Sequence, residues 1–161
     1  MDKVRLISFL AAACITLPAM AESTKDARVD AVLNDIGYKY LSDADGDAKL
    51  TLGGLEDGRT QLMWVNANTN ILGEYESRDL WTIAYLSEKP LSDEKAKKLL
   101  EKNSSYKVGS WSLTKFGAKY AAVFTAQIPA NAGKDVVSAD IRAVALTGDS
   151  VEKELTGKDD M

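Results

Sequence analysis

Residues 79–86, Asp-Leu-Trp-Thr-Ile-Ala-Tyr-Leu, constrain the fold more than any other part of this chain. In an extended segment, successive side chains point to opposite faces of the sheet. One face would carry Trp81, Ile83 and Tyr85, and the other Leu80, Ala84 and Leu86. A strand that is apolar on both faces is typically central in its sheet and covered on both sides. We therefore predict a sheet with this strand in its middle.

Further short runs of alternating polarity predict neighbouring strands. Residues 38–41 and 49–52 lie on either side of a turn and predict a hairpin. The other predicted strands are 60–65, 107–115 and 119–128. Residues 66–70, which include three asparagines, are expected to interrupt the chain between strands.

Apolar residues at three- and four-residue spacing predict helices over residues 23–36, 93–103 and 135–156. The last helix has the longest apolar stripe, formed by Val137, Ile141, Val144, Ala145, Gly148, Val151 and Leu155. Such a stripe is typical of a helix that lies on a sheet. Glu152 is expected on the opposite, solvated side, and the tail 158–161 is expected to bury nothing.

The first 21 residues have the organisation of a secretory signal peptide. Lys3 and Arg5 form a basic start, an apolar run extends from residue 6 to residue 17, and Ala19-Met20-Ala21 provides the cleavage site. The run has about 12 residues, whereas a transmembrane helix needs about 20. We therefore expect no transmembrane span, a signal peptide over residues 1–21, a single domain over residues 22–161, and a periplasmic or secreted location.

Cys14 leaves a second interpretation open, because a cysteine after a short apolar run can become the lipid-modified first residue of a bacterial lipoprotein. Ala11 stands three places before it, where that signal usually has leucine or another bulky aliphatic residue. Cleavage after Ala21 would instead remove the one cysteine and leave 140 of the 161 residues. Such an exported domain must be stable without disulfide bonds.

The charge of the chain argues against nucleic acid and anionic lipid as partners. The net charge is −4, and it becomes −5 when Asp2, Lys3 and Arg5 leave with the signal peptide. Nucleic acid and anionic lipid both require concentrated Lys and Arg. No basic cluster interrupts the acidic balance of this sequence.

The stretch Ser-Asp-Ala-Asp-Gly-Asp-Ala at residues 42–48 looks like a calcium loop but departs from it in spacing. An EF-hand loop that starts at Asp43 needs glycine in its sixth place and glutamate in its twelfth. Those places hold Ala48 and Gly54, and a start at Asp45 would put Lys49 at a ligand position. The sequence therefore predicts a tight turn, with no metal site and no cofactor.

Few residue types remain for catalysis. The chain has no histidine and no cysteine after Cys14, so Cys/His zinc sites, cysteine nucleophiles and the commonest general base are excluded from the mature chain. It has no phosphate loop, G-x-G-x-x-G or G-x-S-x-G motif. We expect no enzyme activity. A hydrolase that uses carboxylates alone is the alternative, and a cleft with two buried acids, one with a raised pKa, would favour it.

Aromatic and amide side chains are the candidates for binding. Trp64, Asn66 and Asn68 lie at the end of a predicted strand. Aromatic residues are enriched in peptide and ligand sites, and Trp64 borders a polar segment, so we expect it to be partly open. Trp81 and Trp111 are expected in the core. Trp64, Asn66 and Asn68 form the candidate site for a peptide or partner protein.

Three motifs follow an order of helix, strands, helix, hairpin, helix: Val108-Gly109-Ser110-Trp111, Tyr120-Ala121-Ala122-Val123-Phe124 and Val151-Glu152-Lys153-Glu154-Leu155. With these motifs the chain resembles the bacterial YbjN-like family, which is related in fold to type III secretion chaperones. The resemblance covers most of the mature chain. It implies an α+β domain with an antiparallel sheet flanked by helices, and the label of a sensory transduction regulator. It supplies no catalytic residues.

These observations together predict an exported binding or regulatory module that engages a peptide or a partner protein. A structural or stress protein without a specific ligand is a further interpretation, which a fully buried set of tryptophans would favour. The sequence does not determine the oligomeric state.

The signal-peptide interpretation predicts the N-terminus of the exported protein. Mass spectrometry of protein purified from the exported fraction should find Glu22 as the first residue, because cleavage follows the A-x-A site. A mature chain that begins at a lipid-modified Cys14 would contradict this expectation and place the protein at a membrane surface.

Overall fold

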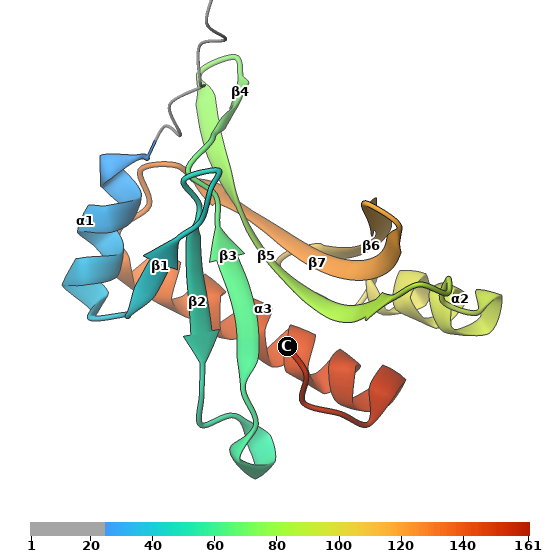
Figure 1. Ribbon diagram of the computed structural model, residues 1–161. Helices are drawn as coiled ribbons and strands as arrows, with labels where there is room; N and C mark the ends of the chain where they lie inside the picture. The colour runs from blue at the N-terminus through green and yellow to red at the C-terminus, as the bar shows by residue number, and fades with distance from the viewer. Residues whose placement is uncertain (1–24) are drawn as a thin grey trace, which may run out of the picture.

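The computed structural model describes residues 25–161, which form an antiparallel sheet with helices (Figure 1). The predicted signal peptide and Cys14 lie outside the described residues. In chain order the elements are α1 (Ala27–Ile36), β1 (Tyr40–Ser42), β2 (Ala48–Leu52), the short 3-10 helix η1 (Glu56–Gly58), β3 (Gln61–Val65), β4 (Asn70–Leu72), β5 (Tyr75–Ser87), α2 (Asp93–Lys102), β6 (Ser110–Phe116), β7 (Lys119–Pro129) and α3 (Lys134–Thr156).

The sheet has seven strands, and its main path runs β1-β2-β3-β5-β7-β6 with every neighbouring pair antiparallel. The predicted α+β fold with an antiparallel sheet is therefore confirmed. The strand that contains residues 79–86 is β5, which pairs with β3 on one side and β7 on the other. Its predicted central position is also confirmed.

One hairpin was not predicted from the sequence. β4 pairs with the first residues of β5, so β5 begins at Tyr75 and has 13 residues. The loop between them consists of Gly73 and Glu74, and Gly73 has a φ of 61°, a value that suits a two-residue hairpin turn. The hairpin of β4 and the start of β5 projects from the rest of the sheet in Figure 1. Ile71, Leu72 and Tyr75 are exposed on it.

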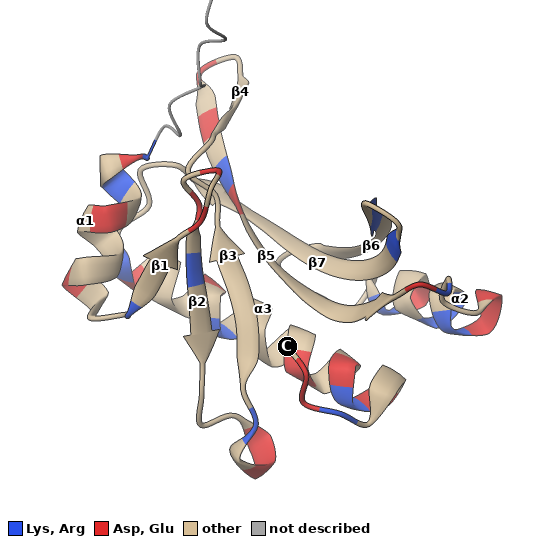
Figure 2. Ribbon diagram, viewed as in Figure 1, with Lys and Arg blue, Asp and Glu red and all other residues tan. Residues whose placement is uncertain are grey.

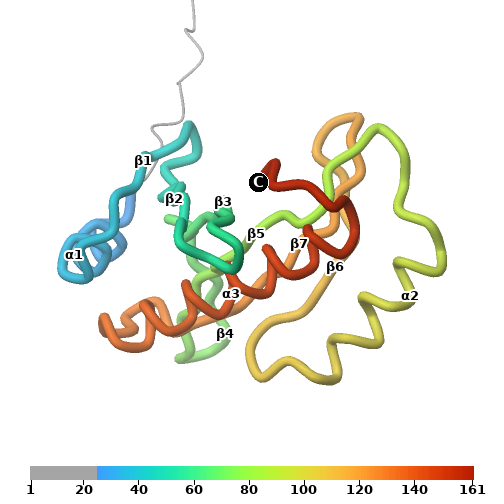
Figure 3. Tube along the Cα trace, turned by 90° about the horizontal axis from the view of Figure 1, so that it is seen from below, coloured from blue at the N-terminus to red at the C-terminus, as the bar shows by residue number. Residues whose placement is uncertain are grey.

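The three helices pack on one face of the sheet, which we call the core face. The core cluster there includes Val29 and Leu33 of α1 and Leu99 of α2. α3 adds the predicted stripe, of which Val137, Ile141, Val144, Ala145, Gly148 and Val151 are buried. In Figure 3, α3 lies on one side of the strands and the C-terminal end of the chain on the other. We predicted that β5 is covered on both sides, and the helices cover it on the core face alone.

A β-bulge changes which side chains of β5 share a face. The register with β7 shifts between Ile83 and Tyr85, so Ala84 is the extra residue. Beyond the bulge Tyr85 packs against the core cluster, and Leu86 joins Ile83 on the other face. The predicted faces are therefore correct through Ala84, which shares the core face with Leu80, and exchanged for Tyr85 and Leu86. A bulge inserts one residue into a strand, which a strict two-residue alternation cannot anticipate.

α3 lies very close to β5 at Gly148. A Cβ atom at this position would lie 2.6 Å from Cγ2 of Thr82 and 3.1 Å from Cδ of Gln61. Neither Thr82 nor Gln61 has any exposed surface. The glycine in the apolar stripe therefore lets the helix backbone approach two polar residues that hydrogen-bond each other, with 2.6 Å between Gln61 Nε2 and Thr82 Oγ1.

The packing of α3 predicts unequal effects for two neighbouring substitutions. Ile141→Ala should lower the free energy of unfolding by about 2 to 5 kcal/mol, because it leaves a cavity at a position with no exposure. Arg142→Ala, on the exposed side of the same helix, should change it by less than about 0.5 kcal/mol. Urea unfolding measures both values, and equal small effects would mean that α3 is not docked on the sheet.

Candidate functional site

The candidate site is the side of the sheet opposite the helices, which we call the open face. The pairing register places Lys49, Trp64, Trp81, Thr125 and Ser110 in one row across β2, β3, β5, β7 and β6. A second, apolar group beside this row consists of Ile83, Ala121 and Val123, with Leu86 against it. Charged residues gather on α1, α2 and the η1 loop, whereas the lower part of β3, β5 and β7 carries few of them (Figure 2).

Three aromatic rings form a stack on the open face. The rings of Trp64 and Trp81 are 4.2 Å apart at an angle of 4°, and Phe116 lies 5.9 Å beyond Trp81 at 17°. Nζ of Lys49 lies over the other side of the Trp64 ring, 5.5 Å from its centre. Trp64 and Trp81 are partly buried and Phe116 is exposed. The stack therefore offers ring edges to a ligand and supports the sheet through cross-strand pairs.

The structure brings together two of the three predicted site residues. Asn66 lies next to the stack, where its Oδ1 accepts a hydrogen bond of 2.7 Å from Nε1 of Trp81. Asn68 is exposed in the following turn and makes no such contact. Trp81, which we expected in the core, is on the open face, and Trp111 is buried on the core face as predicted, with 3% exposure. The sequence missed Trp81 because residues on both faces of this strand are apolar.

A buried arginine holds the strand end that carries Asn66. The guanidinium of Arg78 donates to the carbonyl of Asn66 at 2.5 Å and to Oδ2 of Asp26 at 2.5 Å. Asp26 also caps α1 through the N–H of Arg28. Hydrogen bonds from Arg28 and Arg78 hold the pKa of the Asp26 carboxyl well below its usual range. This network therefore ties α1, β5 and the edge of the site to one another.

The tail 158–161 lies at the open face, contrary to the expectation that it buries nothing. Met161 packs against the apolar group of Ile83, Ala121 and Val123. Figure 1 shows the end of the chain in front of the sheet, with α3 behind it. Oδ1 of Asp159 accepts from the N–H and the hydroxyl of Thr60 at 3.2 and 3.4 Å.

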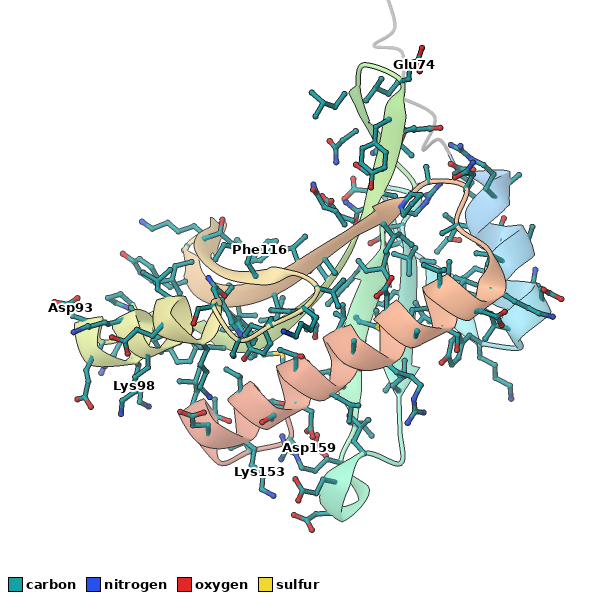
Figure 4. The ribbon with its side chains drawn as sticks, turned by 180° about the vertical axis from the view of Figure 1, so that it is seen from behind. Glu74, Asp93, Lys98, Phe116, Lys153 and Asp159 are labelled. Atoms are coloured by element: carbon teal, nitrogen blue, oxygen red, sulfur yellow. The ribbon has the colours of Figure 1, made fainter. Side chains whose placement is uncertain are left out.

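Three carboxylates converge where the tail leaves α3. Asp149, Glu152 and Asp159 have ligand atoms within 4.8 Å of one another, a group that we did not predict. The Nε of Arg59 lies 2.5 Å from Oδ1 of Asp149, and its Nη2 lies 3.2 Å from Oε2 of Glu152. Figure 4 shows Asp159 near Lys153, beside the η1 loop. The guanidinium of Arg59 therefore supplies positive charge beside these carboxylates, in the place that a metal ion would take.

Glu152 is buried, so the expectation that it is solvated is wrong. Its side chain is 1% exposed, and Oε1 accepts a hydrogen bond of 2.8 Å from the N–H of Asp160. Burial raises the pKa of the Glu152 carboxyl, while this hydrogen bond and the charge of Arg59 act against the rise. The helical stripe did not reveal Glu152 because its partners come from the η1 loop and the tail.

These acids meet part of the criterion for a carboxylate hydrolase. Asp149 and Glu152 are both buried, and one has a raised pKa. Their oxygens, however, bind Arg59 and the backbone of Asp160, and their side chains are 5% and 1% exposed. A pair held in this way has little room for substrate and water between its carboxyl groups. The arrangement therefore favours a structural role that joins the η1 loop, α3 and the tail.

A small hollow borders the apolar group at Ala121 and is a weaker candidate. It has a volume of about 60 Å³ and is lined by Tyr85, Pro90, Leu91, Leu113, Thr114, Tyr120 and Ala121. Sites for small molecules typically measure about 300 to 1,000 Å³. This hollow is therefore too small for such a ligand.

No protein-family model matches the chain, and no curated protein matches it in sequence. Among solved structures it is similar to YbjN, a proposed transcription regulator from E. coli, with a TM-score of 0.45 and 7% identity over 80% of this chain and 86% of that one. The likeness does not establish membership of a family, so the fold class rests on the observed sheet and helices. In residues 25–161, no helix has the length and apolar character needed to cross a membrane.

The contact between Asn66 and Trp81 predicts different effects for two asparagines. Asn66→Ala should lower the free energy of unfolding by about 1 kcal/mol, because Nε1 of Trp81 loses its acceptor. Asn68→Ala, at an exposed position, should change it by less than about 0.5 kcal/mol. Chemical denaturation followed by tryptophan fluorescence measures both values. A larger loss in the Asn68 variant would contradict the assigned positions.

Proposed function

We propose that this chain is an exported, non-enzymatic binding module that holds an extended segment of a peptide or partner protein on its open face. The observation that carries the proposal is the stack of Trp64, Trp81 and Phe116 beside an apolar group on a sheet face without helices. Aromatic anchors next to apolar surface are typical of sites that bind polypeptides.

The chemistry around the stack supports a polypeptide ligand. The row across the sheet includes the hydroxyls of Thr125 and Ser110 and the amine of Lys49, which can bind backbone groups of an extended chain. Nucleic acid and anionic lipid would instead need a concentrated basic surface, which the charge pattern in Figure 2 does not offer on these strands.

The partial exposure of two tryptophans supports binding over a purely structural role. A structural or stress protein without a ligand would be favoured if all three were buried, and Trp64 and Trp81 are only partly so. The engagement of Asp149 and Glu152 by Arg59 supports the absence of hydrolase activity. Export rests on the sequence of residues 1–21, and a periplasmic or secreted location is part of the proposal on that basis.

A selection experiment with a matched pair of variants tests the binding site. A random peptide library displayed on phage is selected against the mature protein, and the binding of enriched peptides is then measured. Ser112→Arg should weaken that binding about tenfold or more, because Ser112 pairs with Val123 on the open face and the new side chain would cover the apolar group. Ser150→Arg, on the exposed side of α3, should leave it unchanged.

Both positions are exposed, so the two variants should fold equally well, which thermal melting verifies. Selection that enriches no peptide, or peptides that bind both variants alike, would refute the proposed site.

A further inference from the structure

The tail shows what chemistry the open face accepts, because a segment of this chain already lies there. Met161 packs against the apolar group of Ile83, Ala121 and Val123, against which Trp64 and Trp81 also pack. Two residues earlier, Asp159 accepts hydrogen bonds from the N–H and the hydroxyl of Thr60. The tail therefore combines one carboxylate contact with one apolar contact.

We infer that the tail 158–161 is an intramolecular ligand of the open face, and that the external ligand is a segment with the same chemistry, a carboxylate two residues before a flexible apolar side chain. This inference rests on the proposed function, since it names the ligand class and the regulation of the same site. An external segment must displace the tail, so the tail lowers the affinity of the site for its partner.

The local backbone directs the tail to this position. α3 ends at Thr156 and is capped by Gly157, which has a φ of 67° and donates to the carbonyl of Lys153. A positive φ at this point lets the chain reverse direction after the helix. The N–H of Asp160 then donates to the buried carboxylate of Glu152, which fixes the point from which the last residue reaches the open face.

The contacts of the tail are few enough to be exchanged. Residues 157–160 are exposed, and Met161 is the one tail residue that is partly buried. An unbranched methionine side chain adapts to irregular apolar surfaces, so other flexible apolar residues could occupy the same position. A tethered segment has an effective concentration in the millimolar range, which makes a weak tail contact an effective competitor.

A binding experiment with the tail itself as the probe tests the inference. The probe is a fluorescently labelled peptide with the sequence of residues 156–161, Thr-Gly-Lys-Asp-Asp-Met. Fluorescence anisotropy measures its binding to the intact mature chain, to a chain that lacks residues 158–161, and to the Met161→Ser variant. Two control peptides carry Asp159→Asn or Met161→Ser.

The shortened chain should bind the probe at least about tenfold more tightly than the intact chain, because no tail competes for the site. Each control peptide should bind the shortened chain about tenfold more weakly, since it loses a hydrogen bond to a charged group or an apolar contact. Equal binding to intact and shortened chains, no binding to the shortened chain, or equal binding of all three peptides would overturn the inference.

A second measurement covers the case in which the shortened chain does not fold. Met161→Ser keeps the hydrogen bonds of Asp159 and Asp160. It should raise acrylamide quenching of tryptophan fluorescence, because the apolar group against which Trp64 and Trp81 pack loses the cover of Met161, while Trp111 stays buried. Unchanged quenching would overturn the inference.

The outcomes separate this inference from the proposed function. Library peptides that bind the open face but do not compete with the tail peptide would leave the proposed function intact and refute the tail as a ligand. Tail binding without any enriched library peptide would refute the proposed function and, with it, the external ligand, and would leave the tail as an intramolecular ligand of the open face.

Discussion

The packing of α3 against one face of the sheet is the constraint on which the rest of the structure depends. Gly148 lets the helix approach Thr82 so closely that no side chain would fit between them. α1 and α2 then complete the same core with Val29, Leu33 and Leu99. Because all three helices occupy the core face, the apolar and aromatic residues of the opposite face have no helix to cover them. The candidate site is a direct consequence of this one-sided packing.

The residues of the open face reduce their exposed apolar area by packing on one another. Trp64 and Trp81 stack in parallel, Phe116 extends the stack, and Lys49 lies over its other end. The bulge at Ala84 turns Leu86 toward this face and Tyr85 toward the core. Aromatic stacking reduces exposed apolar area but leaves ring edges accessible, so the same side chains can stabilise the sheet and meet a ligand.

The ion pairs of Arg59 connect the two sides of the molecule. Its guanidinium binds Asp149 and Glu152 at the end of α3, and Glu152 in turn accepts a hydrogen bond from the tail. Burying three charged groups costs desolvation energy, and removing one partner leaves the others uncompensated. Such a network adds little net stability. It specifies the path of the chain, because it fixes the direction in which the chain leaves α3 and returns to the open face.

The sequence by itself determined most elements of this protein, whereas the tertiary structure decided their faces and added the hairpin of β4 with β5. Periodicity alone identified the central strand, the hairpins at 40–52 and 110–129, and the stripe of α3, because the spacing of apolar residues reflects local geometry. It also suggested Trp64 and Asn66 as site residues, since an aromatic residue beside a polar turn is a local pattern. It could not reveal the bulge at Ala84, the one-sided placement of the helices, or the burial of Glu152. The placement of the helices and the burial of Glu152 depend on contacts between residues far apart in the sequence, such as Arg59 and Glu152, which are 93 positions apart. A local pattern does not record which distant charge will meet a carboxylate once the helix is docked.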